Sequence, residues 1–555
     1  MDDTRAVNFL ERIIEEDVEN NVYHRPVHTR FPPEPNGYLH IGSLYAINLN
    51  YNAARRFGGK FNMRFDDTNP LKEDMEYVNA IIEDMKWAGY DPGNNVFFGS
   101  DYFQMIYDLT EKLIERGLAY VCDLTPEEMH LKRGTLTTAG TNSPYRDRSV
   151  EENLTLFRGM REGVFAPGER VLRAKIDMSS PNMNMRDPVI YRILNATHYR
   201  SGDKWKIYPM YDYAHPIQDA IEDITHSMCS IEFKDHRPLY EWVLNSLDFA
   251  FPEPPKQREF GRINITGAIT SKRYLRQLVS LGYVDGWDDP RLPTVKGLRR
   301  RGFTQSSIHR FLTEIGVSRD MSTVDISMLE SCLRDDLKSK VGSVMAVIDP
   351  LRVTITNYEG DIEYVKVENS NVNPELGTRA LPFGRHILVD RDDFMETPEK
   401  GFHRLYPGNE VRLKGAYFIK CEEVIKDDSG KVIELLCVYD PETKSGSGNV
   451  TRKVKSTLHW VHAEKNLPCD VYLYSRLLTN ENISGEEADW EGAADKGSKV
   501  LMSNAVVEES LRNAAPESRF QFLRHGYFVV DIACKPGEKL RFNRIAALKE
   551  SYRKK

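Results

Sequence analysis

Residues 31–43, FPPEPNGYLHIGS, decide how the first part of this chain folds. Residues 26–31 predict a short strand, and the three prolines that follow exclude a helix and predict a loop. Apolar residues then recur with helical spacing from Leu44 to Ala54, and residues 60–65 alternate as a strand does. Strand, loop, helix and strand in about forty residues predict a βαβ crossover, which binds ligands beyond the carboxyl ends of its strands.

The rest of the chain divides by pattern into further domains. Helical and turn-rich polar stretches alternate between 101 and 205, which predicts an inserted domain. Beyond residue 340, short Val-, Ile- and Tyr-rich runs bounded by turn residues predict β-barrels. We expect an α/β multidomain protein with a Rossmann-type domain. The predicted ranges are 1–25 for an N-terminal helical segment, 26–100 and 206–270 for the Rossmann domain, 101–205 for the insertion, 271–339 for a helical domain and 340–555 for two β-barrels.

The composition is that of a globular protein. Of 555 residues 40% are hydrophobic and 28% charged, which excludes disorder as the dominant state. No apolar run is long enough to span a membrane, and the acidic N-terminus differs from a basic targeting peptide, so we expect a cytoplasmic protein. Seven cysteines without a CxxC pair or a Cys/His cluster argue against structural zinc and disulfides. The net charge is −8, but residues 1–20, with seven acids and two bases, contribute −5, so local basic stretches remain compatible with a nucleic-acid partner.

Two loops carry candidate chemistry. The His-Ile-Gly sequence at 40–42 stands at the start of the first predicted helix, where backbone N–H groups and the helix dipole favour a phosphate. Taken alone it is weak evidence, because a turn histidine before a helix is commoner. A Ser-Lys-Arg sequence at 271–273 follows a second strand-like run at 262–265. A lone sequence of this kind is usually surface, so only the combination is informative.

In combination the two loops resemble the HIGH and KMSKS motifs of class I aminoacyl-tRNA synthetases. The likeness covers nearly the whole chain and, within that class, is to the glutaminyl-tRNA synthetase family. It implies a Rossmann-type class I catalytic domain, an inserted acceptor-stem-binding domain, a helical connecting domain and an all-β anticodon-binding region of two β-barrels. The stretches that carry it are FPPEPNGYLHIG (31–42), RFDDTNP (64–70), SPYRDR (143–148), YPMYD (208–212) and GWDDPR (286–291).

The resemblance implies a ligase that works in two steps. The glutamine carboxylate attacks the α-phosphorus of ATP to give glutaminyl-adenylate and pyrophosphate, and the 2′-OH of the terminal adenosine of tRNA(Gln) then takes the acyl group. Such transfers require positioning and charge stabilisation from the protein. Mg²⁺ would accompany ATP as a substrate ion without a dedicated protein site, and no zinc is expected. The expected partners are tRNA(Gln), glutamine and ATP, without a membrane or DNA, and the expected state is a monomer.

The nucleotide-binding residues of the family match the two loops. His40 and Lys272 are the catalytic candidates, because His40 would meet the phosphates and Lys272 would neutralise charge on the departing pyrophosphate. Ser43 replaces the second histidine of HIGH, and Ile269 replaces the leading lysine of KMSKS. The resemblance therefore implies either altered phosphate contacts or a catalytically weakened paralogue. The ATP-binding candidates are Glu34, Pro35, Asn36, His40, Gly42, Ser43, Arg262, Ser271 and Lys272.

The amino-acid pocket of the family also matches this chain. Arg30 and Asp66 resemble the pair that holds the substrate carboxylate and ammonium. Tyr211 and His215 match positions that face the side-chain amide, although an ordinary core tyrosine is the alternative for Tyr211. Cys229 stands where glutamyl relatives place an arginine, and a glutamine enzyme is better without a buried cation. The glutamine-binding candidates are Arg30, Asp66, Tyr211, His215, Cys229 and Gln257.

Seven positions resemble tRNA contacts of the family. Leu136 matches an apolar wedge that opens the first acceptor pair, and Asp235 matches a minor-groove reader of the acceptor stem. The others match anticodon readers, which use charged and amide groups on splayed bases. For any single Lys or Arg, however, a solvated barrel surface is the commoner explanation. The tRNA-binding candidates are Leu136, Asp235, Arg404, Arg412, Lys414, Gln521 and Arg524.

Three alternatives stay open at this point. A glutamyl-tRNA synthetase of the archaeal and eukaryotic type shares the class and the chemistry, and Cys229 argues against it. Another nucleotidyltransferase with a His-x-Gly loop would leave the β-rich residues beyond 340 without a role. An RNA-binding or regulatory protein with a weakened active site is suggested by Ser43, and retention of Lys272 and Asp66 argues against it.

Overall fold

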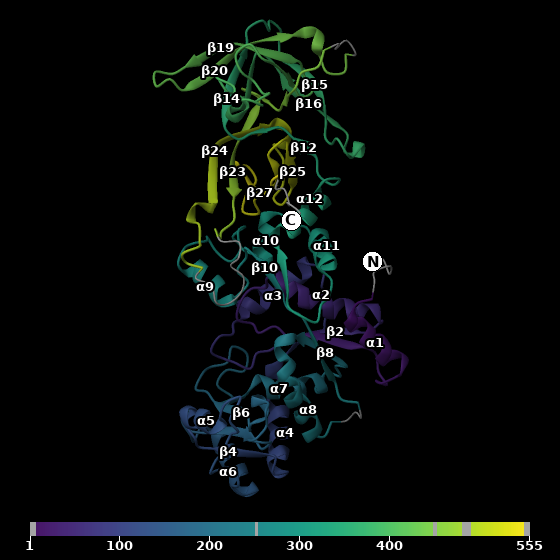
Figure 1. Cartoon of the computed structure of the whole chain (residues 1–555), viewed down its shortest axis with the longest axis vertical. Helices are drawn as coiled ribbons and strands as arrows, with labels where there is room; N and C mark the ends of the chain where they lie inside the picture. Colours follow the sequence, from purple (N-terminus) through teal and green to yellow (C-terminus); the bar gives the residue numbers. More distant parts are fainter. Residues whose placement is uncertain (1–6, 250–252, 448–451, 480–489, 549–555) are drawn as a thin grey trace. The chain divides into compact units, whose positions relative to one another are not determined.

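The computed structural model describes residues 7–249, 253–447, 452–479 and 490–548 (Figure 1). The predicted ranges 1–25 and 340–555 therefore lie partly outside the described residues. The chain forms two compact units, residues 1–264 with 312–324, and residues 265–311 with 325–555. Within the described ranges, no helix is both long enough and apolar enough to cross a membrane.

The first unit is built on parallel strands. β1, β2 and β3 form one parallel sheet, and β8 pairs in parallel with β9. β8 adjoins β1, because the Thr225 N–H donates to the His28 carbonyl at 2.9 Å. The strands predicted at 26–31 and 60–65 are confirmed. Their bounds are β1 (His28–Phe31), β2 (Lys60–Phe65), β3 (Val96–Phe98), β8 (His226–Ser230) and β9 (Lys256–Phe260).

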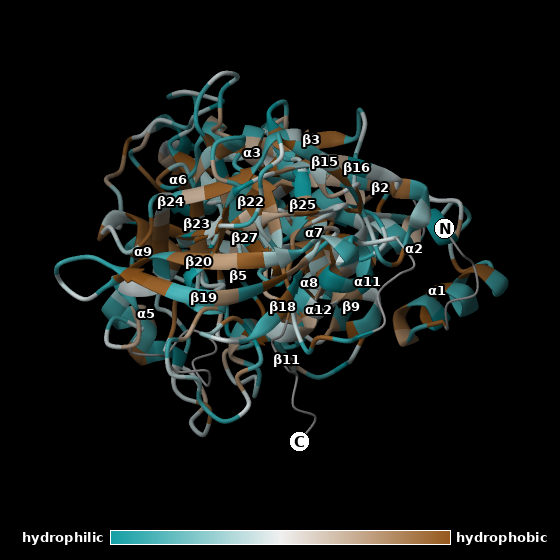
Figure 2. Cartoon of the chain, turned by 90° about the horizontal axis from the view of Figure 1, so that it is seen from above, coloured by the Kyte–Doolittle hydropathy of each residue, from teal (hydrophilic) through white to brown (hydrophobic). Residues whose placement is uncertain are grey.

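Helices follow these strands, as a crossover fold requires. The helix predicted after the glycine loop is α2, and its apolar positions Leu44 and Ile47 are completely buried. The N-terminal helix α1 carries both hydrophilic and hydrophobic residues (Figure 2). Its Leu10 and Ile14 are buried. The bounds are α1 (Phe9–Glu19), α2 (Ile41–Arg56), α3 (Met75–Trp87), α7 (Tyr211–Ile221), η3 (Ile231–His236) and α8 (Arg237–Ser246).

The insertion after β3 folds around an antiparallel sheet in the order β4-β5-β6-β7. β7 pairs with β6, so residues 207–209 belong to this sheet, although the sequence placed them in the Rossmann domain. A strand pattern does not reveal which sheet the strand joins. The elements are η1 (Gly99–Tyr102), α4 (Phe103–Glu115), β4 (Ala119–Cys122), α5 (Pro126–Arg133), α6 (Val150–Glu162), β5 (Val171–Ala174), η2 (Met183–Met185), β6 (Val189–Ile193) and β7 (Ile207–Pro209).

The second unit opens with the helical region that the sequence predicted. α9 packs through Leu275 and Leu278, both completely buried, into a hydrophobic cluster that includes Trp490. α11, β10 and β11 contain the points at which the chain passes between the units. The bounds are β10 (Ile263–Thr266), α9 (Lys272–Ser280), α10 (Val295–Arg301), α11 (Gln305–Ile315), β11 (Ser322–Asp325) and α12 (Ile326–Leu337).

The predicted all-β region is confirmed as two barrel-like sheets (Figure 1). The first barrel has the order β21-β18-β19-β20-β14-β17-β22, and the second has the order β12-β25-β26-β27-β23-β24-β13. β15 and β16 form a separate hairpin. Each barrel has its own core, around Phe383 and Trp460 in the first and around Phe522, Phe528 and Phe542 in the second.

The bounds of the first barrel and the hairpin are β14 (Pro350–Ile355), β15 (Glu363–Glu368), β16 (Thr378–Phe383), β17 (His386–Asp390), β18 (Glu410–Leu413), β19 (Phe418–Lys426), β20 (Val432–Asp440), β21 (Thr457–Leu458) and β22 (Val461–His462). The bounds of the second are β12 (Ser343–Val344), β13 (Ala346–Val347), β23 (Asn466–Tyr474), β24 (Lys499–Glu508), β25 (Arg519–Phe522), β26 (Gly526–Val530) and β27 (Leu540–Ala546). Short helical turns accompany them, η4 (Pro374–Leu376), η5 (Arg391–Asp393), η6 (Pro441–Thr443), η7 (Lys496–Ser498) and η8 (Glu509–Leu511).

Candidate active site

The loop after β1 meets the end of β2 at the carboxyl ends of the parallel strands. The Asp66 N–H donates to the Pro33 carbonyl at 3.0 Å, and the Asp74 N–H donates to the Pro35 carbonyl at 3.1 Å. These bonds bring Asp66 to the loop that carries Glu34, as the crossover predicted. The site therefore lies where ligands of such sheets bind.

His40 caps the N-terminus of α2. Its Nδ1 accepts the Gly42 N–H at 3.1 Å, and its own N–H donates to Ser43 Oγ at 3.5 Å. Ser43 thus closes a capping box, a structural role at the position of the missing second histidine. A Cβ on residue 42 would lie 3.0 Å from the His40 ring, so the contact favours glycine. Because Nδ1 accepts, the proton of the neutral imidazole is on Nε2, which can donate to a phosphoryl oxygen.

Asp219, on α7, is bonded to side chains of two neighbouring parallel strands. Its carboxylate accepts from Arg30 Nε at 3.0 Å, from Arg64 Nη2 at 2.8 Å and from the Tyr240 hydroxyl at 2.9 Å. His215 Nε2 lies 3.0 Å from the second carboxylate oxygen. Burial alone would raise the pKa of Asp219, but Arg30, His215 and Arg64 outweigh it and hold the pKa well below its usual value.

Arg30 is completely buried and bonded on several sides. Besides Asp219, it donates to the Met228 carbonyl at 2.9 Å and to Ser227 Oγ at 2.6 Å, and it contacts His215 Nε2. These partners use most of its N–H groups and neutralise its charge. Its predicted contact with a substrate carboxylate stays a prediction.

Tyr211 and His215 lie one turn apart on α7 and face the same way. Their rings stack with centroids 5.2 Å apart and planes 25° apart, and Phe233 packs against Tyr211 at 5.6 Å. Burial and the Asp66 carboxylate raise the pKa of Tyr211, so its hydroxyl keeps its proton. Burial lowers the pKa of His215, which favours the neutral imidazole. The two predicted residues therefore offer neutral polar groups to a ligand.

Cys229 and Gln257 come from neighbouring parallel strands. Burial raises the pKa of Cys229 to about 12, so the thiol is uncharged. Gln257 Nε2 donates to the Phe233 carbonyl and to Glu259 Oε1, both at 2.9 Å. Both amide hydrogens are thus used, which leaves Oε1 of Gln257 as an acceptor. Glu259 is the register partner of Cys229 and is paired with Arg237.

Asp66 belongs to a group of carboxyls with raised pKa values. Burial raises the pKa of Asp66 to about 7, with a contribution from Glu34 and Asp67, although Arg64 opposes the shift. Burial likewise raises the pKa of Glu73 to about 10, so that carboxyl is neutral. Asp66 is therefore poised to ionise when a cation arrives.

The remaining predicted ATP residues fall in both units. Arg262, in the first unit, donates to Glu232 Oε1 at 2.7 Å. Ser271 is the N-cap residue of α9 and Lys272 is its first residue, both in the second unit. The joint action of His40 and Lys272 on one ATP stays a prediction.

The predicted acceptor-stem residues are exposed. Leu136 has 82% of its side chain exposed, on a loop that follows α5. The loop is held from within by Arg186, whose Nη1 donates to the carbonyls of Arg133 and Thr138 at 2.8 and 2.9 Å. Asp235 lies exposed on η3. An apolar tip on a braced loop fits the predicted wedge.

The predicted anticodon residues divide into two groups. Arg412, Lys414 and Arg524 line one cavity of about 710 Å³ in the second unit. Arg404 and Gln521 do not line it. Arg404 and Arg524 both pair with Asp393 Oδ1, through Nη1 of Arg404 at 3.3 Å and Nη2 of Arg524 at 2.6 Å. Gln521, on β25, is the register partner of Ser343 on β12.

Sequence reasoning missed three residues of this site. Asp219 had a signal, because 211, 215 and 219 lie four apart and share one face of a helix. Arg64 stood in the quoted RFDDTNP stretch without being given a role. No motif or spacing in the sequence around Tyr240 indicated that its hydroxyl would bond to Asp219.

The comparisons with known proteins agree with this geometry. The model of the class I tRNA synthetase (E and Q) catalytic domain matches residues 26–339, and two models of the anti-codon binding domain of that family match residues 344–440 and 457–531. The chain therefore belongs to the class I tRNA synthetases of the glutamate and glutamine type. Its resemblance to the glutaminyl branch of this family is confirmed by the relatives that follow.

A glutamine–tRNA ligase of Clostridium kluyveri is 51% identical over 553 residues, which cover 100% of this chain and 99% of the relative. A glutamine–tRNA ligase of Clostridium perfringens is 52% identical over 549 residues, 99% of each chain. Among solved structures, a glutamate tRNA ligase from Elizabethkingia meningosepticum CCUG26117 has a TM-score of 0.42 at 17% identity, covering 56% of this chain and 70% of that one.

Asp219→Asn should destabilise the first unit strongly. The change leaves buried Arg30 without its carboxylate partner and Arg64 with Glu222 alone, which costs about 3–5 kcal/mol of unfolding free energy. Asp212→Asn is the matched control on the same helix, because Asp212 is half-buried and its ion-pair partner among the described residues is His236, at 2.8 Å. Asp212→Asn should lower the free energy of unfolding by about 1 kcal/mol or less. Urea unfolding measures both, and equal midpoints for the two variants would contradict the role given to Asp219.

Proposed function

We propose that this chain activates glutamine with ATP and transfers it to the 2′-OH of the terminal adenosine of tRNA(Gln). The observation that carries the choice of glutamine is the neutrality of the pocket. Tyr211, Cys229 and Gln257 are uncharged, and the nearby cations Arg30, Arg64 and Arg237 are each paired with a carboxylate. A glutamate carboxylate would find no unpaired counter-charge among them, whereas a neutral amide needs none.

Glutamine would be held at both ends. Asp66 would bind the ammonium group, and Arg30 would donate to the carboxylate through an N–H that its bonds to Asp219, Met228 and Ser227 do not use, as a hydrogen-bond donor rather than as a free charge. At the other end, Tyr211 and His215 would face the amide, and Gln257 Oε1 would accept one of its N–H groups. The side-chain carboxylate of glutamate has no N–H to donate to Gln257 Oε1, and two acceptors would then face each other. This contact would add to the discrimination against glutamate.

In the activation step the protein would position ATP and stabilise charge. Nε2–H of His40 would donate to a phosphate at the N-terminus of α2, Gly42 would let adenosine approach the backbone, and Lys272 would neutralise the departing pyrophosphate. Glu34, Pro35, Asn36, Ser43, Arg262 and Ser271 would complete the site. Mg²⁺ would arrive with ATP as a substrate ion, since this ion usually keeps several waters and is bound largely through substrate phosphates.

In the transfer step the tRNA would contact both units. Leu136 would separate the first acceptor pair and Asp235 would contact the acceptor stem. The cavity lined by Arg412, Lys414 and Arg524 would take an anticodon base, with Arg404 and Gln521 nearby. A monomer in the cytoplasm, without zinc, remains our expectation for the enzyme.

The glutamyl alternative is not favoured by the relatives, which are glutamine–tRNA ligases along the whole chain. The weakened-paralogue alternative rested on Ser43, and the capping role gives this serine a structural reason that does not require a weakened site. One aminoacylation assay tests the proposal, with glutamine and glutamate each offered with tRNA(Gln) and tRNA(Glu). Charging of tRNA(Glu) with glutamate at the higher rate would reject it.

Glutamine binding should depend on pH through Asp66. The ammonium group needs an ionised carboxylate, and the pKa of Asp66 is raised to about 7. The affinity is therefore present above about pH 7, and the KM for glutamine should rise about tenfold per pH unit below it. Asp66→Asn should show a high KM that does not change from pH 5.5 to 7.5. A wild-type KM that stays flat over this range would contradict the role of Asp66.

Lys272→Ala should lower glutaminyl-adenylate formation by about 10²–10³-fold, because the variant lacks the cation that meets the developing pyrophosphate charge. Arg276→Ala is the matched control, since Arg276 is an exposed cation one turn further along α9. Pyrophosphate exchange in the presence of tRNA measures both variants. Full activity of Lys272→Ala would remove the Ser-Lys loop from the active site.

Cys229→Arg should shift specificity towards glutamate. The arginine would bring a cation towards the proposed amide site. Glu259, its register partner on β9, would partly neutralise that cation. The ratio of kcat/KM for the two amino acids should therefore move by less than the about 10⁴-fold of a fully matched site. Cys229→Met adds bulk without charge and should leave the preference for glutamine. No movement of the ratio in Cys229→Arg would show that residue 229 does not face the amide.

A further inference from the structure

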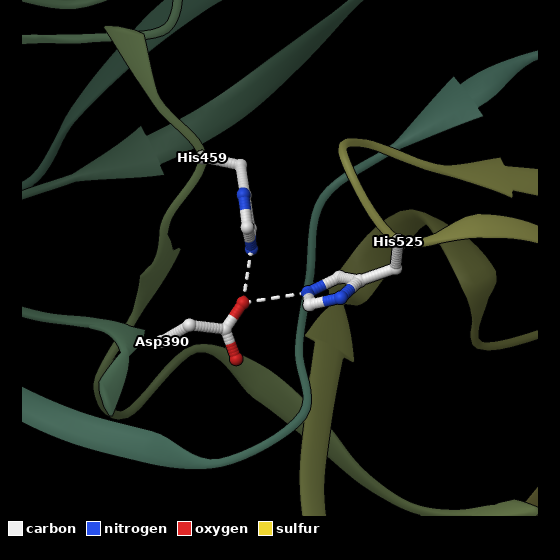
Figure 3. A group of neighbouring side chains, drawn as sticks. All are labelled: Asp390, His459 and His525. Atoms are coloured by element: carbon white, nitrogen blue, oxygen red, sulfur yellow. Dashed lines mark hydrogen bonds and ion pairs between the residues drawn. The ribbon is translucent and has the colours of Figure 1, made fainter. Parts of the chain in front are cut away.

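Asp390, at the end of β17, joins two histidines in the second unit (Figure 3). Its Oδ2 accepts from Nε2 of His459 and from Nε2 of His525, each at 2.6 Å. Its Oδ1 accepts the N–H groups of Ile348 and Asp349 at 2.8 and 3.1 Å. The carboxylate is buried and fully bonded, so its position is closely defined.

The two histidines belong to different barrels. His459 stands between β21 and β22 of the first barrel, whereas His525 stands in the turn between β25 and β26 of the second. The neighbouring Arg524 donates to both oxygens of Asp393, at 2.7 and 2.6 Å. Two adjacent acid–base pairs therefore fasten the hairpin tip, residues 523–525, to the first barrel.

The hairpin tip forms part of the cavity to which we assigned the anticodon. Leu523 and Arg524 line it together with His459, Arg412 and Lys414. Arg524 has a φ of 70°, a left-handed conformation that side chains other than glycine rarely adopt. Such a conformation persists only where surrounding contacts determine it. The bonds of His525 and Arg524 are contacts of that kind.

The same three side chains are also of the type that binds Zn²⁺. In this arrangement, however, both Nε2 atoms are already engaged with one carboxylate oxygen at hydrogen-bond distance. Metal coordination at Nε2 would move the imidazole proton to Nδ1, and Nδ1 of His459 is buried with no partner among the described residues. The geometry favours hydrogen bonds over a metal ion.

We infer that Asp390 and His525 are positioning residues for tRNA recognition, which hold the hairpin tip so that Arg524 faces the anticodon cavity. The inference rests on the proposed function of that cavity. Neither residue needs to touch tRNA, since the carboxylate acts on the tip through His525. Their loss should affect the KM for tRNA(Gln) more than kcat.

His525→Ala in the full-length enzyme tests the inference. Loss of the bond to Asp390 should raise the KM for tRNA(Gln) about tenfold, as loss of one charge-assisted hydrogen bond does. His525→Gln should restore most of the affinity, because glutamine Nε2 can donate from the place of histidine Nε2. His386→Ala is the matched control, since His386 lies on β17, bonds Thr354 at 2.9 Å and does not line the cavity. Its KM for tRNA should equal that of the wild type.

Hydrogen exchange separates this inference from the proposed function. In His525→Ala the backbone of residues 523–526 should exchange faster than in the wild type, whether or not tRNA(Gln) is the substrate. Unchanged exchange at the tip, or an equal rise of KM in His386→Ala, would overturn the inference. One equivalent of Zn²⁺ bound by the wild type and not by His525→Ala would overturn it as well, in favour of a metal site.

Discussion

The first unit depends on the ion pair between the Asp219 carboxylate and the guanidinium groups of Arg30 and Arg64. Arg30 extends from β1, Arg64 from β2 and Asp219 from α7, so one carboxylate ties the helix to two parallel strands. Arg64 also pairs with the buried Glu222 at 3.4 Å, whereas Asp219 is the carboxylate partner of Arg30, so the loss of Asp219 would leave Arg30 as an unpaired buried charge. The helix that carries Tyr211 and His215 is thereby set against the sheet.

The same interaction shapes the chemistry of the pocket. A free arginine beneath the amino acid would select glutamate, whereas an arginine neutralised by Asp219 leaves the choice to neutral groups. Gln257 is oriented by a second buried pair, Glu259 with Arg237, which fixes both of its amide hydrogens. In this structure the buried charges of Arg30, Arg64 and Arg237 are paired with carboxylates, and the groups that we propose to face the substrate amide are uncharged.

In the second unit, Asp390 and Asp393 likewise hold basic side chains in place. Its cavity of about 710 Å³ is lined by residues of both barrels. The bonds of His525 to Asp390 and of Arg524 to Asp393 hold a hairpin tip of the second barrel against the first barrel. In both units a buried carboxylate positions basic side chains that come from distant segments. The residues to which we assign recognition are therefore held by residues that need not contact a substrate.

By itself, the sequence determined the βαβ start, the glycine loop, the strand at 60–65, the all-β region and the family, because periodicity, prolines and motifs are short-range signals. Through the resemblance it also proposed the glutamine-binding residues, which stay a prediction. Only the tertiary structure decided that Asp219 joins Arg30 and Arg64, which lie 189 and 155 residues away, and that β7 belongs to the insertion. Pairing across such separations follows from topology and burial, and neither is written in the spacing of neighbouring residues.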